Sequence, residues 1–294
     1  MTIKSVLIAN RGEIAIRISR AASEMGIRTV AVYAEDDARS LHVLRTDEAH
    51  PLRGAGPAAY LDADQIIEAA KASGCDAVHP GYGFLSENAA FASECAAAGV
   101  TFVGPRPELL DLFGDKVRAR ELAASLGIPT IRGTSTLSLD DARAFLASLP
   151  EAGAIVIKAV AGGGGRGMRV VRDQASLPEA FERCQSEARS AFGNPDVYAE
   201  QLIEHARHIE VQIAGDGRRV THLWERDCTI QRRHQKLIEI APAPFLPDSL
   251  RARIIDAALK IAGHVHYENI GTVEFLVDAV ERGDSAFYFI EANP

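Results

Sequence analysis

A lysine followed by a run of glycines is the part of this 294-residue sequence whose residue types point most directly to chemistry. Residues 155–171 read IVIKAVAGGGGRGMRVV, with Lys158 before the glycines and Arg166 among them. Glycine has no Cβ atom, so the backbone N–H groups of such a loop can approach phosphate oxygens closely. The lysine would add a positive charge. We therefore predict a phosphate-binding loop between two strands.

Other glycine-rich motifs differ from this segment in their context. The spacing satisfies Gly-x-Gly-x-x-Gly, but a dinucleotide-binding fingerprint opens a helix, whereas residues 168–172 continue as a strand. A Walker A loop ends in Gly-Lys-Ser/Thr, and here the lysine precedes the glycines. A protein kinase needs its lysine on the following strand, with HRD and DFG motifs. An ordinary flexible turn remains as the alternative, although five glycines make it entropically unfavourable.

Acidic residues near the end of the sequence are candidate ligands of a divalent cation. Residues 272–278 and 286–292 are predicted strands of a hairpin, and a symmetric turn places Glu274 opposite Glu291. Asn293 shares their face because strand side chains alternate. Facing carboxylates repel each other, and together with an amide oxygen they suit Mg²⁺. An exposed charged hairpin is the alternative. Against it, apolar residues are predicted on the same face: Leu276, Phe287 and Phe289.

Residues 225–236 are dense in hydrogen-bond donors, including Gln231, His234 and Lys236. The prolines at positions 242 and 244 would stiffen the chain that follows. We favour an anion-binding role over a solvated charged loop.

Alternating strand and helix patterns in the first hundred residues predict a parallel sheet covered by helices. The predicted strands are residues 6–9, 29–33, 77–79 and 101–103. One predicted helix follows the first strand and ends at Gly26, with a second at residues 64–73. The apolar face of the first helix comprises Ile14, Ile18, Ala21, Ala22 and Met25. Residues 10–13 (Asn-Arg-Gly-Glu) then lie at the carboxyl end of the first strand, where open sheets bind ligands. An ordinary turn there is equally compatible.

The pattern changes after residue 105, and we place a domain boundary between residues 113 and 114. A helix is predicted at residues 115–125, with Lys116 in its first turn, before Gly127 and Pro129 end it. Further along, a helix at residues 176–190 and a strand at residues 197–203 are predicted.

Composition excludes several classes of protein. Acidic residues outnumber basic ones by 40 to 32 and the pI is near 5.6, so nothing favours a nucleic-acid partner. The four cysteines form no CxxC pair, which indicates reduced, buried thiols in a cytoplasmic protein. The sequence shows neither a signal peptide nor an apolar run that could span a membrane.

Five segments, in order along the whole chain, resemble biotin carboxylase, a family of ATP-grasp ligases. They are NRGEIA at residues 10–15, HPGYGFLSEN at 79–88, Lys158 with its glycine loop, QRRHQK at 231–236 and EANP at 291–294. The resemblance implies an α/β fold in which a Rossmann-like pre-ATP-grasp domain, residues 1–113, precedes an incomplete ATP-grasp domain, residues 114–294. The lid of the second domain would cover about residues 131–203.

The resemblance also implies an activity and its cofactors. ATP with Mg²⁺ or Mn²⁺ would phosphorylate bicarbonate, and the resulting carboxyphosphate would supply CO₂ to biotin on a carrier protein or domain. A carboxyltransferase subunit or domain would then use the carboxybiotin, and the family often forms homodimers.

Site residues carried over from the family fall into four groups. The catalytic residues would be Gln231, His234 and Lys236, the last of them in contact with bicarbonate. The ATP phosphates would be held by Lys116, Lys158, Gly163, Gly164 and Gly165. The rest of the nucleotide would meet Met168, Glu200, Gln201, Ile203, His208, Leu276 and Ile290. Glu274, Glu291 and Asn293 would bind the metal, and Tyr82 and Gly83 would border biotin.

In the family, the last strand runs on into Arg-x-Gln-Val-Glu-His, and the sequence given stops at Pro294. We therefore expect a truncated chain that holds only part of the site. A non-catalytic Mg-nucleotide-binding fragment is one alternative. An ATP-grasp ligase of the carbamoyl-phosphate synthase type is another, which the QRRHQK run disfavours.

Overall fold

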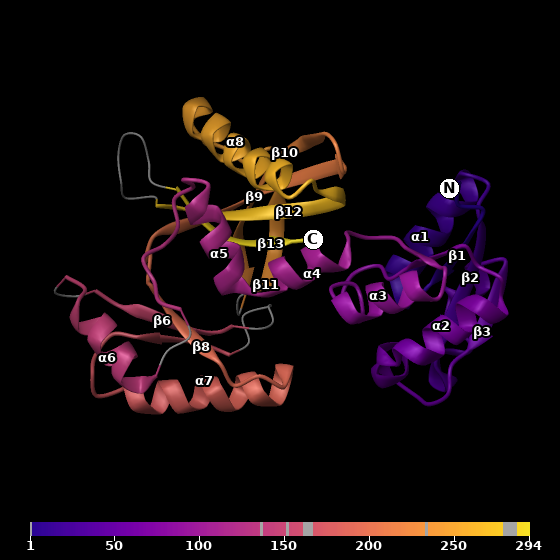
Figure 1. Cartoon of the computed structure of the whole chain (residues 1–294), viewed down its shortest axis with the longest axis horizontal. Coiled ribbons are helices and arrows are strands. Elements are labelled where there is room, and N and C mark those ends of the chain that lie inside the picture. The colour runs from indigo at the N-terminus through magenta and orange to yellow at the C-terminus, as the bar shows by residue number, and fades with distance from the viewer. Residues whose placement is uncertain (1, 136–137, 151–152, 161–166, 233–234, 279–286) are drawn as a thin grey trace. The chain divides into compact units, whose positions relative to one another are not determined.

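The computed structural model of the protein describes residues 2–135, 138–150, 153–160, 167–232, 235–278 and 287–294. The chain divides into two compact units, an N-terminal unit of Met1–Asp111, with which Pro294 is grouped, and a C-terminal unit of Leu112–Asn293. Each unit combines sheet and helices (Figure 1). The predicted α/β class is confirmed.

The N-terminal unit is built on a parallel five-stranded sheet in the order β3-β2-β1-β4-β5. Its strands are β1 (Ser5–Ile8), β2 (Arg28–Tyr33), β3 (Glu48–Pro51), β4 (Ala77–His79) and β5 (Thr101–Phe102). Its helices are α1 (Gly12–Glu24), α2 (Ala63–Ala72) and α3 (Ala89–Ala97), with short 3₁₀ turns at Glu35–Asp37, Val43–Arg45 and Pro57–Leu61. The four predicted strands are confirmed. The edge strand β3, Glu-Ala-His-Pro, was missed because it lacks β-branched residues.

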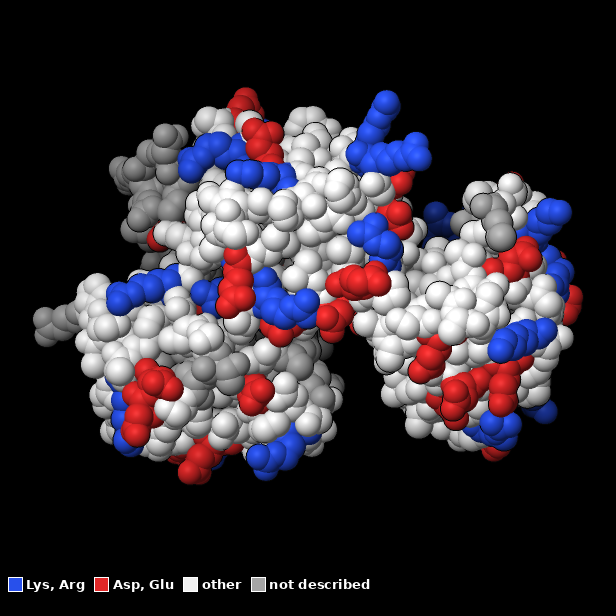
Figure 2. All heavy atoms as spheres, viewed as in Figure 1, with Lys and Arg blue, Asp and Glu red and all other residues white. Residues whose placement is uncertain are grey.

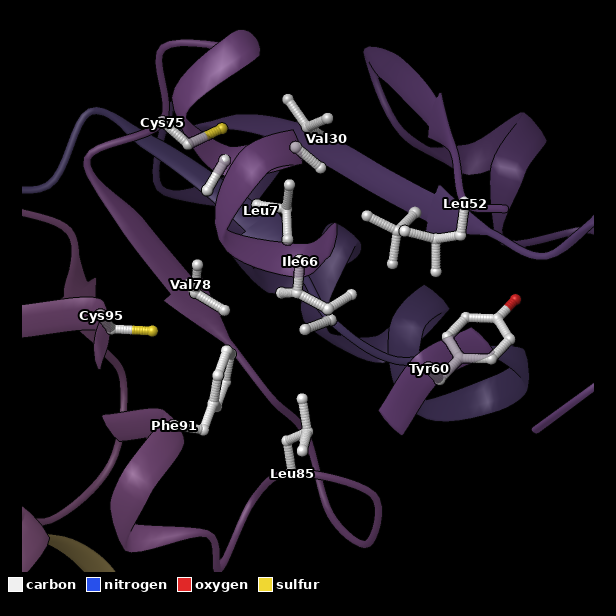
Figure 3. Packing of buried hydrophobic residues seen from close by; sticks show 14 of the residues in the cluster. Leu7, Val30, Leu52, Tyr60, Ile66, Cys75, Val78, Leu85, Phe91 and Cys95 are labelled. Atoms are coloured by element: carbon white, nitrogen blue, oxygen red, sulfur yellow. The ribbon is translucent and has the colours of Figure 1, made fainter. Parts of the chain in front are cut away.

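Alternation along β1 separates two cores. Leu7 packs with Val30, Tyr60 and Phe91 on one face of the sheet (Figure 3), whereas Ile8 packs with the buried residues of α1 on the other. The prediction that Met25 belongs to the apolar face of α1 is wrong. This residue follows the last helical residue, and its side chain is 74% exposed.

The C-terminal unit contains a large antiparallel sheet in the order β11-β10-β9-β12-β13. Its strands are β9 (Ala206–Asp216), β10 (Val220–Arg232), β11 (Gln235–Ile240), β12 (Glu268–Asp278) and β13 (Phe287–Asn293). Helix α8 (Asp248–His264) packs on β9 and β10, and α5 (Lys116–Ser125) packs on β13. Helix α4 (Pro107–Gly114) spans the division between the units. Residues 225–236 therefore belong to a strand pair, apart from 233–234, which lie outside the described residues.

A small antiparallel sheet, in the order β7-β6-β8, completes this unit. It comprises β6 (Ile155–Ala159), β7 (Met168–Val171) and β8 (Val197–Gln201), with α6 (Leu139–Ala147) and α7 (Leu177–Phe192) on one side of it (Figure 1). The predicted strand-loop-strand arrangement is confirmed, because β6 and β7 pair with Lys158 opposite Met168. The glycines between them, Gly163, Gly164 and Gly165 included, lie outside the described residues.

One extended segment, residues 129–134, connects the two sheets of the C-terminal unit. The Phe289 amide of β13 donates to the Pro129 carbonyl at 2.8 Å, and the Thr134 amide donates to the Ala199 carbonyl of β8 at 2.9 Å. The edge of the large sheet is thereby fixed relative to the edge of the small one.

All four cysteines are free and buried, as predicted. Acidic and basic side chains are interspersed on the face of each unit that Figure 2 shows. Among the helices formed by described residues, none combines the length and apolar character needed to cross a bilayer.

Candidate functional site

Three carboxylates lie in a row across the large sheet. The ladder pairs Glu210 of β9 with Glu274 of β12, and Glu274 with Glu291 of β13. We call these residues the carboxylate row. The predicted pairing of Glu274 with Glu291 is confirmed. Glu210 and Glu274 are buried, so the alternative of an exposed charged hairpin is wrong.

The predicted apolar neighbours lie differently, because β13 contains a bulge. Glu291 faces Glu274, but Phe289 faces Phe275, which makes Ile290 the extra residue. Phe287 and Phe289 therefore turn to the opposite face, where both rings pack edge-on against Phe275. The prediction that they share the face of the carboxylates is wrong. A one-residue insertion reverses the alternation, and the sequence does not mark it.

Cations from neighbouring elements surround the carboxylate row. The Lys236 Nζ atom contacts Glu210 and lies 2.7 Å from Glu274 Oε1. At the other end, the Lys116 Nζ atom lies 2.5 Å from Glu291 Oε2. The Asn293 amide nitrogen donates to Glu274 Oε1 at 2.7 Å. The predicted metal residues and both lysines are thus brought together in the C-terminal unit.

Charge pairing outweighs burial for these groups. Burial opposes the ionised form of Glu291, but Lys116 overcomes it and lowers the pKa of this carboxyl. For Lys116 and Lys236, burial acts against the ammonium form, yet the neighbouring glutamates raise the pKa of both. Burial likewise disfavours the charged form of Glu210, and Lys236 and Arg226 hold its pKa below the usual value. Fixed cations therefore favour the ionised form of Glu210 and Glu291.

His208 links the carboxylate row to the QRRHQK run. The Gln231 side-chain amide lies 2.8 Å from His208 Nδ1, and His208 Nε2 contacts Glu274 Oε2. If the amide donates, Nδ1 accepts and the ring proton sits on Nε2, directed at the carboxylate. His234 lies outside the described residues.

A second charged cluster surrounds Glu200 on β8. Glu200 is buried, with the Lys158 Nζ atom 2.5 Å and the Arg120 Nε atom 3.1 Å from its carboxylate. The arginine pair lacks the angles of a hydrogen bond, so it is an ion pair only. Lys116 and Arg120 are one turn apart on α5, and they reach the large and small sheets respectively.

The remaining nucleotide-side candidates are partly buried. Met168 begins β7 opposite Lys158, and Leu276 faces Tyr288 on the ladder. The backbone N–H of Gln201 already donates a hydrogen bond to the Arg132 carbonyl, at 2.8 Å. Ile203 lies two residues beyond the end of β8. Tyr82 and Gly83 belong to the N-terminal unit, in the turn after β4.

Sequence reasoning missed Glu210 and Arg120, and it placed Arg226 in the donor-dense run 225–236 without identifying its partner. Arg226 holds Glu210 by two nitrogens and also donates to Gln212 at 3.0 Å. Polar residues at 208, 210 and 212 alternate with Ile209, Val211 and Ile213, a strand pattern that could have predicted Glu210. No local pattern marks Arg120, because it lies on α5 and its partner Glu200 lies on β8, distant in sequence.

Residues 2–110 match the family described as biotin carboxylase, N-terminal domain, and residues 115–294 match carbamoyl-phosphate synthase L chain, ATP binding domain. Pyruvate carboxylase of Bacillus subtilis is 52% identical over 302 residues, covering 100% of this chain and 25% of that protein. The chain thus spans about a quarter of the length of the curated relatives it matches.

Solved structures agree with these matches. The Campylobacter jejuni biotin carboxylase–β-γ-ATP complex has a TM-score of 0.93 at 43% identity, covering 99% of this chain and 65% of that one. The biotin carboxylase domain dimer of Hydrogenobacter thermophilus 2-oxoglutarate carboxylase, with MgADP and bicarbonate, has a TM-score of 0.93 at 41% identity. It covers 100% of this chain and 64% of that one. With its biotin carboxylase N-terminal domain and ATP-binding domain, this chain belongs to the biotin carboxylase family.

Proposed function

We propose that this chain takes part in the ATP-dependent carboxylation of carrier-bound biotin by bicarbonate. The observation that carries the proposal is the carboxylate row, flanked by Lys116 and Lys236 on one face of the large sheet. Such a face offers oxygens to a divalent cation and positive charge to phosphate and bicarbonate.

The residues fit a magnesium ion. Glu274 and Glu291 are adjacent hard oxygen donors, and Asn293 is held against Glu274 through its amide nitrogen, which leaves its amide oxygen as a further donor. Bound there, Mg²⁺ or Mn²⁺ supplies the positive charge that phosphoryl transfer requires. Before nucleotide binds, Lys116 pairs with Glu291 and Lys236 pairs with Glu274.

Anionic substrates would meet three lysines. Lys116 and Lys158, each paired with a carboxylate, would exchange that partner for ATP phosphates, with Gly163, Gly164 and Gly165 adding backbone N–H groups. Lys236, whose raised pKa keeps it protonated, would hold bicarbonate. His208, oriented by Gln231, would fix the geometry of Glu274. His234 is proposed as a catalytic residue from the resemblance.

The rest of the nucleotide would lie between the two sheets of the C-terminal unit. The proposed contacts are Met168, Glu200, Gln201, Ile203, His208, Leu276 and Ile290. The Glu200 carboxylate is enclosed by Lys158 and Arg120, and the backbone N–H of Gln201 is bonded to the Arg132 carbonyl. We therefore prefer the backbone of Ile203 as the contact for the base.

Tyr82 and Gly83 are proposed to border biotin. We further propose domains of residues 1–113 and 114–294, the second carrying a lid at about 131–203. A biotin carrier and a carboxyltransferase, in the same or another chain, would be the partners. The Hydrogenobacter thermophilus domain is described as a dimer, which supports a homodimer here.

The nucleotide and metal part can be tested on this chain by calorimetric titration with MgADP. Replacing both metal carboxylates, Glu274→Gln with Glu291→Gln, should weaken binding about tenfold or more by removing the charged oxygens. Glu179→Gln with Glu182→Gln makes the same change of charge on the exposed side of α7 and should leave affinity unchanged. Equal affinity in all three proteins would contradict the proposed metal site.

The reaction itself requires the natural protein that contains this sequence. ATP hydrolysis should depend on bicarbonate, and carboxylation of biotin should follow. If MgADP binds but neither bicarbonate dependence nor biotin carboxylation is seen, the proposed activity is wrong and the chain is a nucleotide-binding module.

A further inference from the structure

One side chain of the NRGEIA segment, that of Asn10, is hydrogen-bonded to the turn that follows β4. The Asn10 Nδ2 atom donates to the Pro80 carbonyl at 2.6 Å and to the Tyr82 carbonyl at 2.8 Å. Its Oδ1 atom accepts from the Arg11 amide at 2.8 Å. Asn10 is only 3% exposed, so this carboxamide is committed to the protein interior.

Close approach to Asn10 also explains the glycine between these carbonyls. Gly81 has φ +68°, and a Cβ atom built on it would lie 2.8 Å from Asn10 Nδ2 and 3.2 Å from Ile14 Cγ1. The Asn10 side chain therefore occupies the space that a side chain at position 81 would need. Neither could change without moving the turn.

Side-chain contacts of Tyr82 and Phe84 also hold the turn. The Tyr82 hydroxyl donates to Glu13 Oε1. Phe84, at a strained φ of 46°, stacks on the buried Tyr60 ring with centroids 5.3 Å apart. A non-glycine residue in this region persists only where its surroundings impose it.

The side-chain contacts of residues 10–13 favour a structural role for this segment over a ligand-binding one. They lie at the carboxyl end of β1, beside the uncapped start of α1, where a ligand could bind. Asn10 is bonded to the turn, Arg11 pairs with Asp37 at 2.9 Å, and Glu13 places a negative charge in the first helical turn. Asn10 and Arg11 are thus committed to partners within the protein, and the charge of Glu13 would repel an anionic ligand.

We propose that Asn10 is a positioning residue that fixes the Tyr82–Gly83 turn for the biotin half of the reaction. Its two amide protons define where the Pro80 and Tyr82 carbonyls lie, and hence where the tyrosine ring and Gly83 are presented. The reference to biotin rests on the proposed function, whereas the hold on the turn does not.

Asn10→Asp tests the donor role, because it keeps the shape and replaces the donors by a carboxylate facing two carbonyl oxygens. In the natural protein, KM for biotin should rise about tenfold or more, while bicarbonate-dependent ATP hydrolysis without biotin stays within about twofold. Asn88→Asp is the matched control. Toward the described residues, that side chain accepts from the Phe91 amide at 2.9 Å and donates no hydrogen bond, so aspartate preserves the cap of α3 and both activities.

A second variant covers the case in which Asn10→Asp fails to fold. Gly81→Ala should displace the same turn from the other side and raise KM for biotin with ATP hydrolysis preserved. If the wild-type protein carboxylates biotin and both variants retain its KM, the inference is wrong. If the wild type does not carboxylate biotin, the proposed function fails instead.

Limited proteolysis of this chain tests the hold on the turn independently of activity. Chymotryptic cleavage after Tyr82 should be about fivefold faster in Asn10→Asp and unchanged in Asn88→Asp. Equal cleavage rates in the wild type and Asn10→Asp would overturn the positioning role whatever the enzyme does.

Discussion

Arg120 joins α5 to the small sheet through an ion pair with Glu200. Its guanidinium donates to the Ile131 carbonyl at 2.8 Å, pairs with Glu200 and lies 5.6 Å from the centroid of the Tyr198 ring. Lys116, one turn earlier on the same helix, pairs with Glu291. A residue that packs against Arg120 therefore affects the position of α5, and with it both the Glu200 cluster and the carboxylate row.

Gly133→Ala is predicted to disturb this arrangement. A Cβ atom there would lie 2.7 Å from Arg120 Nη2 and 2.8 Å from the Ala199 carbonyl, and the backbone oxygen cannot move cheaply. We expect a loss of about 1–3 kcal/mol in the free energy of unfolding, measured by urea denaturation, and weaker MgADP binding. Gly114→Ala is the matched control, since nothing lies within 4 Å of its added Cβ. Equal stability of the two variants would contradict the close packing at Gly133.

Helix α8 is attached to the large sheet by one buried ion pair. Glu225 of β10 is fully buried, and its Oε1 atom lies 2.9 Å from Arg251 Nε and 3.2 Å from the Ala243 amide. The pair fixes the helix, the strand and the segment that joins them. The pairing of β10 with β9 shifts register between His222 and Glu225. This bulge directs the Glu225 carboxylate inward.

Arg251→Met is predicted to be strongly destabilising because it leaves an uncompensated carboxylate in the interior. We expect a loss of about 3–5 kcal/mol in the free energy of unfolding, measured by chemical denaturation. The double variant with Glu225→Gln removes the buried charge and should recover a large part of that loss. Additive effects of the two substitutions would show that the pair does not hold α8.

At the scale of the whole molecule, the two units should respond differently to nucleotide. All the proposed nucleotide and metal ligands lie within Leu112–Asn293. At a free ligand concentration one hundred times Kd, binding adds about 2.7 kcal/mol to the stability of the state that binds. We therefore expect MgADP to slow amide hydrogen exchange in the C-terminal unit and leave Met1–Asp111 unchanged.

Hydrogen exchange followed by mass spectrometry makes this measurement directly. The Glu274→Gln and Glu291→Gln protein, at the same ligand concentration, serves as the control and should lose most of the protection. Equal protection of both units in the wild type would contradict a nucleotide site confined to the C-terminal unit.

The sequence by itself determined four of the five strands of the N-terminal sheet, the pairing of β6 with β7, and the pairing of Glu274 with Glu291. These features depend on local alternation, turn residues and short-range register, which neighbouring residues specify. The family motifs added the expected roles of Lys116, Lys158 and Lys236. The bulge at Ile290, the exposure of Met25 and the strand character of residues 225–232 did not follow from local pattern.

Only the tertiary structure decided which charges neutralise each other. Glu210 becomes part of the carboxylate row because β9 lies beside β12, and Arg120 reaches Glu200 because residues 129–134 join two sheets. Likewise, the role of Asn10 is visible only where the ends of β1 and β4 meet. Burial makes an unpaired charge or amide costly, so the fold must supply its partner, and that partner comes from strands distant in sequence.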